Sequence, residues 1–268
     1  MYNTTLRNEL TPLADEYAKK KYGKTYLNLS PSSKDAIIFN NLAFNFHPSS
    51  WNVIDKDTFY KNRTIKIHSH FKSSKPAVYE MQSSNSSDAL AMNIFCYPNI
   101  QNCLGLKKLF EVDEITKIDF GFKAKVLKLK VGKVYSDKTE VDLLLNDNII
   151  CECKLTEEGF TTKNKAEVES YKNFSAVFHM DKLIQNETSY LNYQLIRNIL
   201  AAYQHKSRFI LLSDMRRPDL AKSFYQTVRC IQDKYLDLRT NCEIVYWQDI
   251  AQVVPKDLKH FLKEKYGI

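Results

Sequence analysis

Four short apolar runs within residues 118–155 do most to constrain how this chain of 268 residues can fold. They are rich in Val, Ile, Leu and Phe, a composition typical of strands. The runs are residues 118–122, 126–135, 141–145 and 149–155. In the second run, Lys128 and Lys130 alternate with apolar residues, which is the period of a half-buried strand. Asn146-Asp147-Asn148 has turn chemistry, so the last two runs predict a tight hairpin.

Helical spacing is found on both sides of these strands. Residues 87–95 predict a helix capped by Ser86 or Ser87, and residues 11–21 predict another near the start of the chain. After the hairpin we expect helices at 167–180, 189–204, 220–235 and 256–266, and strands at 209–213 and 243–247. Antiparallel strands followed by alternating helices and strands predict an α/β layered core around a mixed sheet.

The N-terminal part of the chain is basic. Residues 1–75 hold 12 Lys/Arg and 6 Asp/Glu, so +6 of the net charge of +8 lies there. Such a segment suits a polyanion, and cations among aromatic residues at 55–76 can grip a phosphate backbone. Lys61, Arg63 and Lys66 are the candidate nucleic-acid contacts. A solvated Lys-rich surface on a plain loop or edge strand is the alternative interpretation.

Charged residues interrupt the predicted hairpin. Strand alternation sends Glu152 and Lys154 to one face, and Cys151 and Cys153 to the other. A carboxylate and an ammonium in an apolar strand are costly to bury without a partner, and the hairpin brings Asp142 beside Glu152. Two converging carboxylates favour Mg²⁺ or Mn²⁺, and Lys154 can serve a water or stabilise charge at phosphorus. An exposed Glu152–Lys154 ion pair is the alternative.

This arrangement resembles a known group of nucleases. An Asp, a spacer and Glu-x-Lys on a β-hairpin are similar to the PD-(D/E)xK superfamily, with Asp142 in the D position and Glu152-Cys153-Lys154 as the ExK. More narrowly, four segments resemble a bacterial family of proposed restriction endonucleases, over about residues 80–215. They are Ser86-Ser87-Asp88-Ala89 to Phe95, Thr139-Glu140-Val141-Asp142, Glu152-Cys153-Lys154-Leu155-Thr156-Glu157, and Tyr193-Gln194-Leu195-Ile196-Arg197. The chain departs from these patterns twice: no Pro precedes Asp142, and Asp88 stands where that family has Gln.

The resemblance implies a restriction endonuclease-like core, an α/β fold with helices flanking a mixed β-sheet in αβββαβ order. We expect this core at residues 79–268, after a basic N-terminal extension at 1–78 that contacts DNA. The implied activity is metal-dependent endonucleolytic hydrolysis of DNA phosphodiester bonds in restriction or defence. Asp142 and Glu152 would bind Mg²⁺ or Mn²⁺, and Lys154 would serve the nucleophilic water. Double-stranded DNA is the expected partner. Cutting both strands with one site per chain favours a homodimer.

Five further residues carry weaker predictions. Glu80 precedes the helix at 87–95, where superfamily members often supply an extra acidic metal ligand, and Asp88 is its rival. Gln194 and Arg197 lie three apart on one helix face. Facing the active site, Gln194 would join the catalytic residues and Arg197 would hold a phosphate; facing outward, both would be solvated. Glu157 is expected to cap or brace the loop after the Glu-x-Lys strand.

Other classes of protein fit the sequence poorly. With six glycines, the chain has no GxGxxG, P-loop or GxSxG motif. It has no apolar run long enough for a membrane span and no signal-peptide pattern, so we expect a cytoplasmic protein with six free thiols. Two alternatives to a DNA endonuclease stay open. One is a non-catalytic nucleic-acid-binding or assembly module, and the other is a nuclease acting on RNA or on branched or damaged DNA.

Overall fold

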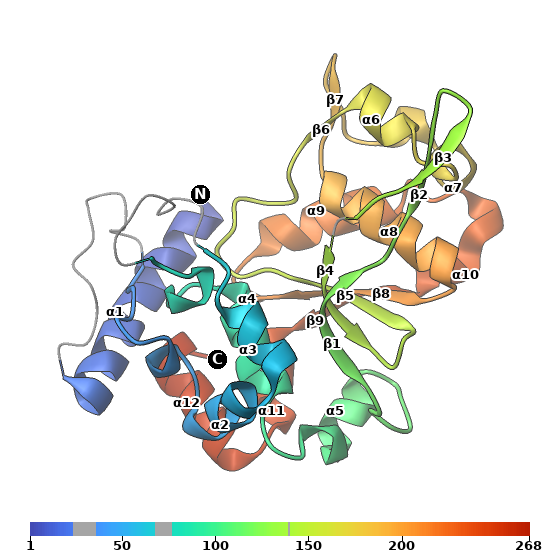
Figure 1. Cartoon of the computed structure of the whole chain (residues 1–268). Helices are drawn as coiled ribbons and strands as arrows, with labels where there is room; N and C mark the ends of the chain where they lie inside the picture. The colour runs from blue at the N-terminus through green and yellow to red at the C-terminus, as the bar shows by residue number, and fades with distance from the viewer. Residues whose placement is uncertain (24–35, 68–76, 139) are drawn as a thin grey trace.

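The centre of the protein is a five-stranded mixed sheet with strand order β1-β4-β5-β8-β9 (Figure 1). The computed structural model describes residues 1–23, 36–67, 77–138 and 140–268. The strands are β1 (Ile118–Lys123), β4 (Glu140–Leu145), β5 (Ile149–Cys153), β8 (Arg208–Ser213) and β9 (Cys242–Tyr246). β1, β4 and β5 pair antiparallel, whereas β8 and β9 add parallel to β5. The predicted α/β class with a mixed sheet flanked by helices is confirmed.

The hairpin of β4 and β5 forms as predicted. Leu145 pairs with Ile149, and Asn148 N–H donates to Leu145 O at 3.1 Å. Asn146 and Asp147 between them have φ values of 52° and 59°. Two such left-handed residues match the right-handed twist of the flanking strands, and Asn and Asp tolerate this conformation better than most residues. The hairpin lies centrally, because β5 pairs with β8 on its other side.

Strand alternation divides the interior into two hydrophobic clusters, one on each face of the sheet. Leu143 and Cys151 face one cluster, and Leu144 and Ile150 face the other. The first cluster takes side chains from α1 (Tyr2–Tyr22), α2 (Pro48–Lys56), α4 (Ser87–Phe95), α5 (Leu104–Leu109), α11 (Trp247–Val253) and α12 (Lys256–Tyr266). The second takes side chains from α6 (Lys165–Glu169), α7 (Phe174–Val177), α8 (Tyr193–His205) and α9 (Pro218–Val228). β5 is therefore buried along its whole length.

The N-terminal residues share this core. Leu6 of α1 and Ile54 of α2 belong to the same cluster as Leu143 of the sheet. Helix α3 (Thr58–Thr64) lies beside β1. The division of the chain at residue 78 stays a prediction, but the described residues before it pack against the sheet.

Several predicted elements match closely. α4 has the predicted bounds of 87–95, and the Ser86 hydroxyl caps it by accepting from Ala89 N–H at 3.2 Å. α12 matches the helix predicted at 256–266. All six cysteines are free thiols, and Cys151 and Cys153 lie in the core as expected.

Other elements are shorter or more divided than predicted. The run 126–135 is a hairpin of β2 (Leu127–Lys130) and β3 (Lys133–Ser136), because Val131 and Gly132 turn the chain at positive φ. The helix expected at 11–21 is part of the longer α1, which accommodates Pro12 within it. The helix expected at 189–204 begins only at Tyr193, after a short strand β7 (Ser189–Tyr190) that pairs with β6 (Lys163–Asn164).

Two predicted helices are interrupted because their backbones pair with distant segments. In 167–180, Lys172 N–H donates to Leu127 O at 2.9 Å, and the chain divides into α6, α7 and a 3-10 turn. In 220–235, Gln232 N–H donates to Val177 O at 2.8 Å, and α9 ends at Val228. A short helix α10 (Leu236–Thr240) follows. Among the described residues, the 3-10 turns are Leu42–Asn45, Glu80–Gln82, Ile100–Asn102, Met180–Lys182 and Asp233–Tyr235.

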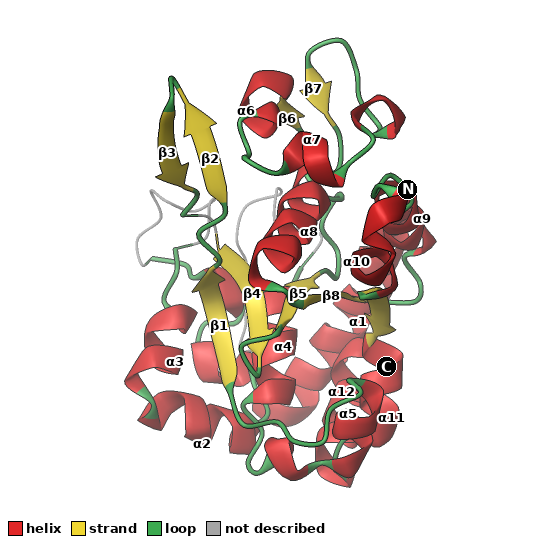
Figure 2. Cartoon of the chain, turned by 90° about the vertical axis from the view of Figure 1, so that its right-hand side faces the viewer, coloured by secondary structure: helices red, strands yellow, loops and turns green. Residues whose placement is uncertain are grey.

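The two small β-structures outside the central sheet both lie at one end of it. The start of β4, the ends of β5 and β8, and the start of α8 meet there. The β2–β3 hairpin and the β6–β7 segment project from this same end (Figures 1 and 2). No described helix combines the length and apolar character needed to cross a membrane.

Candidate active site

Asp142, Glu152 and Lys154 meet at this end of the sheet. Asp142 Oδ2 accepts a hydrogen bond from Cys153 N–H at 2.8 Å, which ties it across the hairpin. Lys154 Nζ lies 3.0 Å from Glu152 Oε1. Glu152 is 1% exposed and Lys154 is 6% exposed. The alternative of an exposed ion pair on a one-sided sheet is therefore wrong, because the pair lies inside the protein beside a second carboxylate.

Helix α8 holds Glu152 through two amides. Gln194 Nε2 donates to Glu152 Oε1 at 2.8 Å, and Lys154 Nζ donates to Gln194 Oε1 at 3.1 Å. Asn198 Nδ2 donates to Glu152 Oε2 at 2.6 Å. Gln194 therefore faces the site rather than the solvent, and it fixes the separation of Glu152 and Lys154. Asn198 was missed in the sequence, although its spacing of four from Gln194 places both on one helix face.

Arg197 lies behind these amides. It is 3% exposed, and its Nη2 donates to Asn198 Oδ1 at 2.7 Å and to Glu140 O at 3.0 Å. Because Oδ1 of Asn198 accepts from Arg197, its Nδ2 is directed to Glu152. A contact between Arg197 and nucleic acid does not fit this burial. The guanidinium orients the side chain that holds Glu152.

The three cations predicted to contact nucleic acid differ in their surroundings. Lys61 and Lys66 are exposed and pair with Asp55 and Glu80, at 2.7 and 2.8 Å. Arg63 is instead mostly buried. Residues 68–76 of the predicted basic segment, and Thr139 of the T-x-x-D match, lie outside the described residues.

Arg63 connects two acidic side chains beside the site. Its Nη2 lies 3.1 Å from Asp88 Oδ2, and its Nη1 lies 2.9 Å from Glu140 Oε2. Gly121 makes room for it, since a Cβ at that position would lie 2.3 Å from Nη1. Gly121 also has a φ of +66°, so another residue there would be strained as well as crowded. Arg63 is thus a structural neighbour of the carboxylates rather than a free cation.

The charges at the site act strongly on one another. Removal from water, followed by the charges of Glu152 and Asp88, raises the pKa of Asp142 well above its ordinary value. Burial also raises the pKa of Asp88, against the opposing charge of Arg63. Burial alone would lower the pKa of Lys154, but Glu152, Glu157 and Asp142 together raise it. These neighbouring carboxylates therefore favour the charged form of Lys154.

The carboxylates suit a hard divalent cation. Asp142 and Asp88 are partly buried, whereas Glu152 is fully buried. Among the described residues, no three His, Cys, Asp or Glu side chains converge into a ready-made metal site. Mg²⁺ does not need one, because it usually keeps several waters and binds one or two carboxylates together with substrate phosphate. Asp142 and Glu152 would supply those two, and a cation there would offset the burial and the charges of Glu152 and Asp88 that raise the pKa of Asp142.

The loop after β5 is fixed by Glu157 within it and by Arg217 and Trp247 from distant segments. Glu157 braces it as predicted, since Oε2 accepts from Leu155 N–H at 2.6 Å and Oε1 accepts from the Ser87 hydroxyl at 2.5 Å. Arg217 donates to Leu155 O at 2.8 Å and to Glu157 O at 2.9 Å. Trp247 Nε1 donates to Lys154 O at 2.9 Å. The position of Lys154 thus depends on contacts that span more than 60 residues of sequence.

Asp142→Asn is expected to raise the melting temperature of the metal-free protein at pH 8. The folded protein holds the Asp142 proton to a higher pH than the unfolded chain, because its pKa is raised. Ionisation of Asp142 therefore lowers stability as the pH rises above about 4, and the amide removes this loss. The difference should shrink towards pH 4 in thermal melts with EDTA. Asp147→Asn, on the exposed turn of the hairpin, is the matched control.

Mg²⁺ should raise the melting temperature of the wild type but not of Asp142→Asn, because binding to the folded state stabilises it. An equal metal-induced shift in both proteins would remove Asp142 from the metal site.

Comparison with known proteins agrees with the geometry. No solved structure and no curated protein sequence shows significant similarity to the chain. A family model described as "Restriction Endonuclease associating with ARP" matches residues 13–267, which is nearly the whole chain. The predicted likeness to restriction endonucleases is confirmed, and the chain belongs to this family.

Proposed function

We propose that this protein is a metal-dependent endonuclease that hydrolyses phosphodiester bonds in double-stranded DNA. The observation that carries the proposal is the buried Glu152–Lys154 pair beside Asp142, whose pKa is raised by burial and then by neighbouring carboxylates. Membership of a restriction endonuclease family supports it. The order α4, β1, β4, β5, α8, β8 in the sheet region supports assignment to the αβββαβ core of such enzymes.

Each residue of the site has a distinct role in this proposal. Asp142 and Glu152 would hold Mg²⁺ or Mn²⁺, which supplies Lewis-acid polarisation of the phosphate and a more acidic water. Lys154 would stabilise the negative charge that develops on the phosphoryl oxygens and hold the attacking water. Gln194 positions Lys154 and Glu152 by bonding both, and Asn198 holds the other oxygen of Glu152.

A third carboxylate would come from Asp88. Its charge acts directly on Asp142, and it lies in the first turn of α4. Glu80 is the second candidate, since its charge acts on Asp88. In the structure, Glu80 forms an ion pair with Lys66. On metal binding, Arg63 would balance the remaining charge of Asp88 and Glu140.

The proposal is tested by incubating the purified chain with supercoiled plasmid, linear duplex, single-stranded DNA and RNA. We expect cleavage of plasmid with Mg²⁺ or Mn²⁺ and none with EDTA. Preferential cleavage of RNA or of branched DNA would reassign the substrate but keep the chemistry. Tight binding to DNA without cleavage under any divalent metal would favour a non-catalytic binding module.

We also propose the setting in which this activity works. The family description names restriction endonucleases that associate with ARP, which supports a role in restriction or defence alongside a partner protein. The cytoplasm is the location that we propose for this role. The described residues of each chain form one such site, so a homodimer would allow both strands to be cut. Light scattering of the purified chain, alone and with duplex DNA, would measure its oligomeric state.

A further inference from the structure

The ribbon formed by β2 and β3 leaves the sheet between β1 and β4, at the end where Asp142 and Glu152 lie (Figures 1 and 2). Residues 129–136 are all exposed, and Val131 at its tip is 101% exposed. An isolated two-stranded hairpin is only marginally stable in water. The rest of the protein must therefore hold the ribbon in place.

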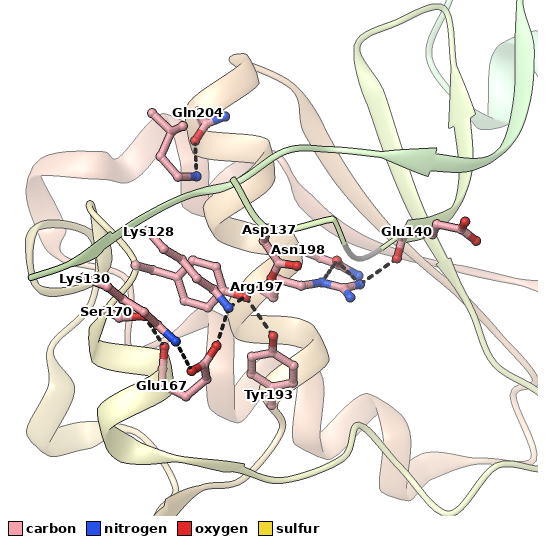
Figure 3. A network of polar contacts seen from close by, with 12 residues as sticks. Lys128, Lys130, Asp137, Glu140, Glu167, Ser170, Tyr193, Arg197, Asn198 and Gln204 are labelled. Carbon is pink, nitrogen blue, oxygen red and sulfur yellow. Dashed lines mark hydrogen bonds and ion pairs between the residues drawn. The ribbon is translucent and has the colours of Figure 1, made fainter. Parts of the chain in front are cut away.

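Polar contacts fix the base of the ribbon to α6 and α8 (Figure 3). Glu167 pairs with Lys128 at 2.6 Å and with Lys130 at 2.8 Å. Asp137 accepts from the Tyr171 hydroxyl, which lies 2.7 Å from the hydroxyl of Tyr193 at the start of α8.

Hydrogen bonds donated by the backbone of the ribbon add to this anchoring. Leu129 N–H donates to Ser170 O at 2.6 Å, and Leu127 N–H donates to Gln204 Oε1 at 2.9 Å. Because Gln204 also lies on α8, the helix that holds Glu152 orients the ribbon as well. The direction of the ribbon is therefore fixed relative to the candidate active site.

The two faces of the ribbon differ in chemistry. The register places Leu129 opposite Val134 on one face, and Lys130 opposite Lys133 on the other. Like charges directly across a strand pair are unfavourable unless something neutralises them. Glu167 balances Lys130, but Lys133 has no carboxylate partner among the described residues. Residues 123–138 contain six Lys and one Asp, a formal charge of +5.

We propose that the β2–β3 ribbon is a DNA-binding arm that enters the major groove of the duplex lying across the active site. This inference rests on the proposed nuclease function. The major groove is about 12 Å wide and admits a two-stranded β-ribbon. Lys133 and Lys138 would contact phosphates, and Val131 would lie nearest the bases. Open grooves of about 530 and 590 Å³ flank the ribbon, and lysines line both.

The test compares the salt dependence of DNA binding in two double variants, with Ca²⁺ in place of Mg²⁺ to limit turnover. Lys133→Gln/Lys138→Gln alters the arm. Lys107→Gln/Lys108→Gln alters two lysines of α5, which lies at the opposite end of the sheet (Figure 1), and is the matched control. Each phosphate contact contributes about 0.9 to the slope of log K against log salt. The arm variant should reduce the magnitude of that negative slope by about two, and the control should keep the wild-type value.

Plasmid cleavage by the wild type with Mg²⁺, measured in parallel, separates this inference from the proposed function. Unchanged slopes with active cleavage would overturn the arm and leave the nuclease intact. A lower slope in the arm variant without any wild-type cleavage would support the arm and overturn the nuclease. A wild type that does not bind DNA would also overturn the arm.

Discussion

Lys154→Ala is expected to lower the single-turnover rate of DNA cleavage by about 10²–10³-fold, the usual effect of removing one electrostatic stabiliser of a transition state. Lys154 is buried, forms an ion pair with Glu152 and donates a hydrogen bond to Gln194, so we expect it to contribute little to binding of the DNA backbone. Affinity measured with Ca²⁺ should therefore change little. The measurement is a rapid-quench time course with enzyme in excess over DNA.

Two controls make the Lys154 result specific. Lys108→Ala removes an exposed lysine far from the site and should leave both rate and affinity unchanged. The melting temperature of Lys154→Ala should show that the variant is folded, because Gln194 and Asn198 still hold Glu152. Loss of DNA affinity with an unchanged single-turnover rate would reverse the role assigned to Lys154.

Arg217→Met is expected to lower the free energy of unfolding by about 3 kcal/mol, since buried carbonyls left without a donor cost about 1–3 kcal/mol each. Arg217 is 0% exposed, and it donates to Leu155 O and Glu157 O. It also forms an ion pair with Asp219 at 2.8 Å. Met has a similar length and fills the space, so the change reports mainly on the lost hydrogen bonds. Urea denaturation monitored by circular dichroism measures it.

The Arg217 variant should also cleave DNA more slowly, because the backbone that follows Lys154 loses its anchor. Lys117→Met is the matched control, since Lys117 forms ion pairs with Asp119 and Asp147 at the surface and should contribute little to stability. Equal unfolding free energies for Arg217→Met and the wild type would show that Glu157 and Trp247 fix the loop without Arg217.

The hairpin and its charged residues could be predicted because the information is local. Apolar alternation identifies β4 and β5, and Asn146-Asp147 identifies the turn between them. Once the turn is known, the period of a strand places Glu152 and Lys154 on one face. The buried strand β8 and the capped helix α4 were predictable on similar grounds.

The remaining parts depend on contacts between distant segments. Nothing near Arg217 in the sequence indicates that it binds the loop after β5, and nothing near Arg63 indicates that it faces Asp88 and Glu140. The basic N-terminal segment suggested nucleic-acid contact for Arg63, and a shared helix face with Gln194 suggested it for Arg197, but both are buried in networks with acidic or amide groups. The helix expected at 167–180 is divided because its backbone pairs with the β2–β3 ribbon. Such pairing between distant segments overrides helical propensity, and nothing in the local sequence indicates that it will occur.

The central claim, that Asp142, Glu152 and Lys154 form a metal-dependent phosphodiesterase site, is tested most directly by single-turnover plasmid cleavage with wild type and Asp142→Asn in parallel. Asp142→Asn keeps an oxygen that can accept from Cys153 N–H, so it changes the charge at the site more than the fold. The proposed mechanism predicts cleavage by the wild type with Mg²⁺, none with EDTA, and a loss of at least about 10²-fold in the variant at equal DNA affinity. Wild-type cleavage that persists in EDTA, or an Asp142→Asn variant as fast as the wild type, would contradict it.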